Sequence, residues 1–96
     1  MEQKQLKLSS QQKEIIYLIS CLKKNSEIAE LMRKTPQLIA VSVSQLENKL
    51  ACSNRNELLI NAILIVQGFD DYDLARVINL YGPSPYSFKI VKKELI

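Results

Sequence analysis

The stretch that decides the fold is TPQLIAVSVSQLENKL, residues 35–50, which has the clearest helix start in the chain. Thr35 is a good N-cap, and Pro36 suits the first helical position, where a backbone N–H has no partner to lose. Apolar residues then recur at the spacing of one helix face: Ile39, Val43, Leu46 and Leu50. We therefore predict a helix over residues 36–50 with one buried side.

The opposite side of this predicted helix is uncharged, with one lysine at its edge. It consists of Gln37, Ala40, Val41, Ser44, Gln45 and Asn48, and Lys49 lies beside it. Two pairs of basic residues come earlier in the chain: Lys23 and Lys24, then Arg33 and Lys34. Amides and hydroxyls can hydrogen-bond to base edges or phosphates, and basic side chains can neutralise phosphates. The same residues also suit an ordinary solvated surface, so both interpretations stay open.

Two helices are predicted before this segment. The first covers residues 10–22, capped by Ser9 or Ser10, and its apolar stripe is Ile15, Ile16, Ile19 and Leu22. After a polar break, a short helix covers residues 26–33, capped by Asn25 or Ser26, with an inner face of Ile28, Ala29 and Met32. A helix, a short helix, a tight turn and a capped helix, in this order, make a helix-turn-helix.

Two more helices are predicted after it. One runs from Asn54, with Glu57 completing a capping pair, to Gln67, where Gly68 offers a left-handed stop. Its centre, residues 58–66, is apolar nearly all round and needs cover on two sides. We assign one side to the bundle and the other to a partner or to the C-terminal extension. The last helix starts at Asp70 or Asp71 and ends at Tyr81, with Leu74, Val77, Ile78 and Tyr81 inward.

Residues 8–58 resemble the LuxR-type (GerE-type) DNA-binding domain without a gap, and the resemblance extends to about residue 66. The matching residues are Leu8, Ser9, Glu14, Ile15, Ile16, Leu18, Ile19, Asn25, Glu27, Ile28, Ala29, Thr35, Ile39, Lys49, Leu50, Arg55, Glu57 and Leu58. The triplet Glu27-Ile28-Ala29 is shared with other helix-turn-helix families. Lys49-Leu50, followed by Arg55 and Glu57-Leu58, is more specific to the LuxR type.

The resemblance implies an all-α fold, a four-helix LuxR-type helix-turn-helix bundle over residues 1–67 with a helical extension, residues 68–96, packed on the same domain. It implies a transcription regulator that places residues 36–50 in the major groove of double-stranded DNA. Base contacts would come from the positions of Ala40, Val41 and Ser44, and phosphate contacts from Lys49 and the turn before the recognition helix. The fourth helix would form a homodimer, or a heterodimer with another regulator, through Leu59, Ile63 and Val66.

The sequence departs from the family pattern where bases are read. The usual Thr-Val-Lys segment is Leu38-Ile39-Ala40, and the usual His is Ser42. The glycine that often follows the first helix is Leu22. Specificity could come from Gln37, Ser44, Gln45 and Asn48, from Val41 against a thymine methyl, or from DNA shape. The alternative is a protein–protein adaptor, or anti-regulator, that keeps the fold without specific DNA binding.

Composition restricts the other classes of function. Hydrophobic residues make up 47% of the 96 residues, enough for one folded domain, and the net charge of +3 permits nucleic-acid binding without demanding it. Histidine is absent, and no nucleophile–base pair, phosphate loop or metal-ligand spacing occurs, so we expect no enzyme, cofactor, metal or small-molecule substrate. The three aspartates near residue 70 suit helix capping better than metal binding.

The remaining expectations concern the cysteines, the location and the two ends of the chain. Cys21 and Cys52 sit in apolar patterns and are expected to be buried thiols. The polar N-terminus has no apolar core of a signal peptide, and the longest apolar run is too short for a membrane span, so we expect a cytoplasmic protein that contacts no membrane. Residues 86–95 alternate like a strand but also suit a short helix, which we favour.

Overall fold

The computed structural model describes residues 7–85, which form five α-helices and no strand. The helices are α1 (Ser10–Ser20), α2 (Asn25–Met32), α3 (Pro36–Lys49), α4 (Arg55–Gln67) and α5 (Asp71–Tyr81). The all-helical class is therefore confirmed for this part of the chain. The short helix favoured after residue 85 lies outside the described residues.

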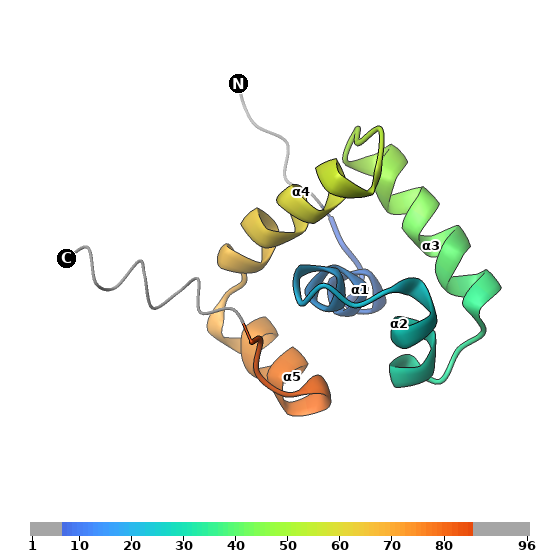
Figure 1. The fold of residues 1–96 in the computed structure, drawn as a ribbon. Helices are drawn as coiled ribbons and strands as arrows, with labels where there is room; N and C mark the ends of the chain where they lie inside the picture. Colours follow the sequence, from blue (N-terminus) through green and yellow to red (C-terminus); the bar gives the residue numbers. More distant parts are fainter. Residues whose placement is uncertain (1–6, 86–96) are drawn as a thin grey trace, which may run out of the picture.

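The first helix is the centre of the molecule. Figure 1 shows α1 in the middle, with the other helices around it. Its most extensive contacts are with α4, while α2 packs mainly against α3. Every residue from Ile15 to Ser20 is buried, so α1 is covered on all sides instead of along one stripe. The Ser20 hydroxyl is buried with its hydrogen bond made, because it donates to the Tyr17 carbonyl oxygen at 2.6 Å.

Four of the five helices begin at a side-chain cap. Ser9, Thr35, Asn54 and Asp70 each accept a hydrogen bond from the backbone N–H three residues on. The exception is α2, which begins at Asn25 and has Lys24 as its N-cap residue, so the predicted caps Asn25 and Ser26 are wrong. At this helix start the side chain of Glu27 reaches back to the residue before the helix: its Oε1 accepts a hydrogen bond from the Lys24 backbone N–H at 2.8 Å.

The helix ends differ from expectation at residues with a left-handed backbone. α1 ends two residues early, because Leu22 has φ 65°, and Leu22 is 54% exposed instead of completing the apolar stripe. α2 ends at Met32, because Arg33 has φ 59°. Gly68 has φ −92°, so it does not provide the left-handed stop predicted for it. A left-handed backbone costs an L-residue roughly 1–2 kcal/mol of conformational free energy. A glycine at position 22 would avoid this cost, whereas Leu22 does not.

Leu22→Gly is therefore expected to stabilise the protein by about 1 kcal/mol, because relief of the positive φ outweighs the contacts of a half-exposed side chain. The measurement is the free energy of unfolding in urea. Ala51→Gly, at φ 57°, is the matched control for strain relief without loss of a large side chain. A Leu22→Gly variant less stable than the parent would show that this side chain contributes more than its backbone costs.

Polar contacts hold α5 against α1. Lys13 Nζ pairs with Asp73 Oδ2 at 2.8 Å, and Arg76 Nη1 pairs with Glu14 Oε2 at 2.7 Å. The Tyr81 hydroxyl donates to Glu14 Oε1 at 2.6 Å, so Glu14 receives two donors from α5. We call these three contacts, together with the bond from the Tyr17 hydroxyl to the Gly82 carbonyl at 2.7 Å, the α1–α5 latch. Residues 71–82 are thereby attached to the same body as α1.

Two tyrosines of the latch are expected to make stability fall at alkaline pH. Burial raises the pKa of Tyr17 to about 12, and burial together with the Glu14 carboxylate raises the pKa of Tyr81. A raised folded-state pKa means that the stabilisation is complete below the unfolded value of 10.0 and is lost as the pH rises from there through about 12. We expect the free energy of unfolding to decrease across this window, and to decrease less steeply in Tyr17→Phe. Tyr72→Phe, at an exposed tyrosine, is the control. Equal slopes in Tyr17→Phe and the parent would contradict this origin.

Candidate nucleic-acid interface

The third helix is seated on the bundle by the residues predicted to seat it. Thr35 Oγ1 accepts from the Leu38 N–H at 3.2 Å, and Pro36 is the first helical residue. Ile39 and Leu46 are completely buried, Val43 is 5% exposed, and Leu50 packs partly buried against the same core. The predicted helix and its buried side are confirmed. Because this side faces the core, the opposite side of α3 faces away from it.

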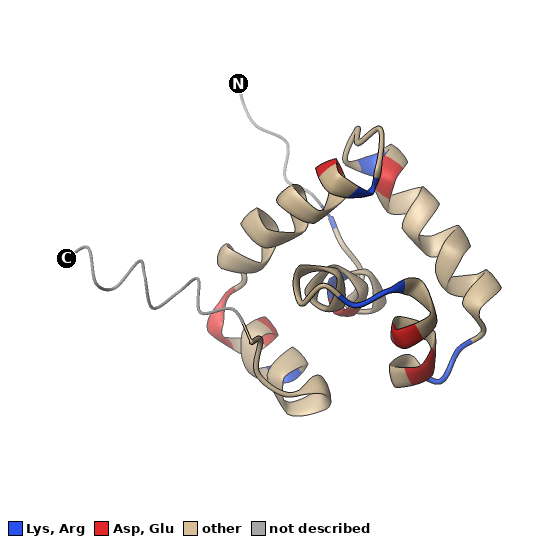
Figure 2. Cartoon of the chain, in the orientation of Figure 1, with Lys and Arg blue, Asp and Glu red and all other residues tan. Residues whose placement is uncertain are grey.

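That opposite side, which we call the α3 face, points outward along its whole length. All six of its predicted members are exposed: Gln37, Ala40, Val41, Ser44, Gln45 and Asn48. Figure 2 shows that most of α3 carries no charge, with charged residues only near its C-terminal end. The acidic residue of α3, Glu47, is half-buried and close enough to Arg55 to act on the pKa of its guanidinium. The α3 face therefore offers amides, a hydroxyl and small apolar groups, with no carboxylate among them.

Basic residues lie at both ends of the α3 face. Arg33 and Lys34 form the turn between α2 and α3, where Arg33 is exposed and Lys34 half-buried. Lys49 is exposed in the last turn of α3, and its Nζ donates to the Lys7 carbonyl oxygen at 2.8 Å. Figure 2 shows this arrangement as basic segments before and at the end of a largely uncharged helix. This arrangement would place positive charge beside both edges of a rod-like polyanion that lay across α3.

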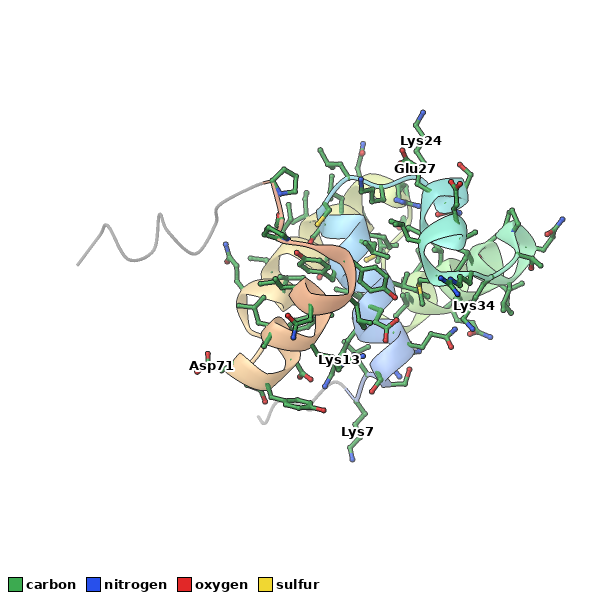
Figure 3. The ribbon with its side chains drawn as sticks, turned by 90° about the horizontal axis from the view of Figure 1, so that it is seen from below. Lys7, Lys13, Lys24, Glu27, Lys34 and Asp71 are labelled. Carbon is green, nitrogen blue, oxygen red and sulfur yellow. The ribbon has the colours of Figure 1, made fainter. Side chains whose placement is uncertain are left out.

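Lys24 lies apart from this group. It is exposed at the start of α2, whereas Lys34 follows the end of the same helix, so α2 separates them by about 12 Å along its axis. Figure 3 shows the Lys24 side chain extending away from the molecule near Glu27, and Lys34 at the other end of α2. The structure therefore gathers Arg33, Lys34 and Lys49 with the α3 face and leaves Lys24 at a different edge.

The residues predicted for the dimer interface are not the ones that α4 exposes. Val66 is 4% exposed and belongs to the core, so it cannot contact a partner in the folded protein, and that prediction is wrong. Leu59 is half-buried and packs against the core, and Ile63 is half-buried as well. Ile60 and Leu64 are instead 60% and 61% exposed, one helical turn apart. The outward apolar pair of α4 is therefore Ile60 and Leu64.

Sequence reasoning also missed a surface pocket at the α1–α2 turn. The pocket has a volume of about 460 Å³ and is lined by Ile19, Leu22, Lys23, Lys24, Asn25, Arg55 and Leu59. Arg55 holds one wall of the pocket in place, because the Arg55 guanidinium donates to Asn25 Oδ1 and to the Lys23 carbonyl oxygen, both at 2.8 Å. Burial lowers the pKa of this guanidinium. The pocket is lined by residues of α1, the α1–α2 turn and α4, which come together only in the folded chain, so no local sequence pattern indicates it.

The two thiols differ in their surroundings. Both cysteines are free; Cys21 is buried, as predicted, whereas Cys52 is only half-buried. Burial, with Glu57 and Glu47 nearby, raises the pKa of Cys52, which disfavours the reactive thiolate. Among the described residues, no three His, Cys, Asp or Glu side chains gather closely enough to hold a metal ion. The acidic residues near position 70 are used otherwise: Asp70 caps α5 and Asp73 pairs with Lys13.

Within residues 7–85, no helix combines the length and the apolar character that crossing a membrane requires. Comparison with family models, with curated proteins and with solved structures gives no match to this chain. The chain's own residues and their arrangement are therefore the basis on which a function can be proposed.

Proposed function

We propose that this chain is a DNA-binding transcription regulator that inserts α3 into the major groove of double-stranded DNA. The observation that carries the proposal is the α3 face, which is exposed, free of carboxylates and bordered by Arg33, Lys34 and Lys49. A protein surface that approaches a phosphate backbone must avoid negative charge at the contact and supply positive charge at its edges. The α3 face meets both requirements.

We further propose that helices α1 to α4 form a LuxR-type bundle. Support comes from the short connection between α2 and α3, in which residues 33–35 separate the two helices. A second support is the turn after α1, where the LuxR type often has glycine and this chain has Leu22 with a positive φ. Leu22 thus adopts the backbone that a glycine at this position would favour.

The α3 face predicts modest base selectivity. A bidentate arginine or lysine contact to guanine contributes roughly 1–3 kcal/mol of discrimination, and the centre of the α3 face has neither residue. Gln37, Gln45 and Asn48 carry amides of the kind that pair with adenine, and Val41 can contact a thymine methyl. We therefore expect a preference for A·T-containing sites and a large share of the affinity from phosphate contacts.

A fluorescence anisotropy titration tests the proposal. Labelled promoter fragments from the source genome, with a shuffled duplex as control, are titrated at several salt concentrations. We expect the logarithm of the association constant to fall with the logarithm of the salt concentration with a slope of about −3 for each protomer bound, because Arg33, Lys34 and Lys49 each contribute roughly 0.9. No binding to any duplex at low salt would overturn the proposal.

Dimerisation through α4 is part of the same proposal, with Ile60 and Leu64 as its centre. Ile60→Glu with Leu64→Glu is expected to convert a dimer into a monomer, because each carboxylate would be desolvated in the contact. Sedimentation equilibrium measures this change. Leu80→Glu, at a residue of α5 that is 55% exposed, is the control and should leave the mass unchanged. A parent chain that is already monomeric at high concentration would contradict the dimer.

A specific observation favours a second candidate function, a protein–protein adaptor. Leu31, Leu38 and Val41 are 44%, 46% and 53% exposed on α2 and α3, and the proposed DNA contact uses only Val41 among them. An adaptor would bind another regulator through these side chains and would tolerate loss of the basic turn. Val41→Ser with Leu38→Gln separates the two functions, because it should abolish an adaptor contact while leaving the salt slope of DNA binding in place.

A further inference from the structure

We propose that the pocket at the α1–α2 turn binds a small amphipathic anion, with an apolar tail and a carboxylate head. Three apolar side chains, Ile19, Leu22 and Leu59, line the pocket. Three basic residues, Lys23, Lys24 and Arg55, line it as well, and none of its lining residues is acidic. At about 460 Å³, the pocket has the size of a small-molecule site.

Leu22 gives the second, independent observation. Its backbone has φ 65°, where glycine would fit without strain, and its side chain is 54% exposed, so it contributes little to the core. A strained residue that the fold does not need for packing indicates a function for its side chain. Because Leu22 lines the pocket, its apolar side chain is available to a ligand that covers it.

Arg55 supplies a fixed positive charge in the wall of the same pocket. Its two hydrogen bonds, to Asn25 Oδ1 and to the Lys23 carbonyl, join the start of α4 to the α1–α2 turn and hold the guanidinium in place. Glu47, the acidic residue that acts on Arg55, is not part of the pocket lining. Lys23 and Lys24 add charges that can move toward a bound carboxylate. The charge of the pocket selects an anion, and its apolar side chains select a ligand with a tail.

The α3 face contributes no residue to this pocket, so the proposal does not depend on DNA binding. Its test therefore contains no DNA. The ¹⁵N-labelled chain is titrated with decanoate, kept below its micelle concentration, while two-dimensional amide spectra are recorded. Decanol and decyltrimethylammonium, with the same tail, are the matched ligands. We expect saturable shifts at residues 19–25, 55 and 59 with decanoate, roughly tenfold weaker binding of decanol, and no saturation with the ammonium.

Three variants make the result decisive. Leu22→Gly is expected to weaken decanoate binding by roughly tenfold while the protein becomes more stable, so the loss cannot be ascribed to misfolding. Ala51→Gly, which relieves the same kind of backbone outside the pocket, should bind decanoate like the parent. Lys23→Gln with Lys24→Gln should remove most of the preference for decanoate over decanol.

The proposal would be overturned by an absence of saturable shifts with decanoate, by equal affinity for decanoate and decyltrimethylammonium, or by undiminished binding by Leu22→Gly. Binding only to vesicles of anionic phospholipid, with none to monomeric decanoate, would also overturn it, because the ligand source would then be a membrane surface.

Discussion

Changing Arg33 and Lys34 together to glutamate is expected to weaken DNA binding by roughly a hundredfold or more at moderate salt. The two residues form the turn before α3, so reversal of their charge places two carboxylates against the phosphates that the turn would contact. Loss of two phosphate contacts in each protomer should also make the salt slope smaller by about 1.8 for each protomer bound, at roughly 0.9 for each contact. Anisotropy titrations at three salt concentrations measure both quantities.

A milder pair of variants separates this local effect from a change in net charge. Arg33→Gln with Lys34→Gln lowers the net charge by two, and so does Asn56→Glu with Asn79→Glu, at exposed residues of α4 and α5. The first pair should reduce both the affinity and the salt slope, whereas the second should leave the slope unchanged. If the charge-reversed turn binds DNA like the parent while its circular dichroism is native, the regulator proposal fails. Retained activity in cells would then favour the adaptor.

Glu14→Ala is expected to have the largest effect on stability, about 2–3 kcal/mol. Glu14 accepts from Arg76 at 2.7 Å and from the Tyr81 hydroxyl at 2.6 Å, and its own side chain is 17% exposed. Without this carboxylate, the half-buried Arg76 guanidinium keeps only its bond to the Ser10 carbonyl oxygen, at 3.1 Å, and the half-buried Tyr81 hydroxyl loses its acceptor. Losing one partner of such a pair costs more than the pair itself contributes. Since small domains are stable by only about 5–15 kcal/mol, such a loss is a large fraction of the total.

In Glu14→Ala, the loss of stability should appear first as local unfolding of α5 and only then as unfolding of the whole chain. We expect hydrogen exchange in α5 to accelerate strongly in Glu14→Ala, while the amides of α2 and α3 change much less under native conditions. Glu14→Gln keeps an acceptor for the Tyr81 hydroxyl and should lose clearly less stability. Equal destabilisation by alanine and glutamine would show that the negative charge alone accounts for the effect. Unchanged exchange in α5 would contradict the latch.

The starts of four of the five described helices were predictable from sequence, because capping is a local interaction. Ser9, Thr35, Asn54 and Asp70 need only the backbone N–H three residues on, and the chain itself brings that group near. The seating of α3 was predictable for a similar reason, because its apolar residues repeat with the period of one helix face. The exposed members of the α3 face then followed from helical geometry.

Other features depend on contacts that the sequence pattern does not encode. The end of α1 was misplaced because a leucine gives no sign of a left-handed backbone, and Leu22 adopts one within the assembled turn. The outward side of α4 was misassigned because residues 58–66 are apolar nearly all round, so periodicity could not separate buried Val66 from exposed Ile60. The pairing of Glu14 with Arg76 joins residues 62 positions apart, which no local rule detects.

The α1–α5 latch also determines how the chain should respond to force. The helices that it joins, α1 and α5, are the first and last of the described chain, while α2 and α3 contact each other over a short stretch of sequence. Tension applied at the two ends would therefore load the latch before any other contact. An optical-trap recording should show α5 detaching in a first, low-force extension. The remaining four helices should then rupture together at a higher force.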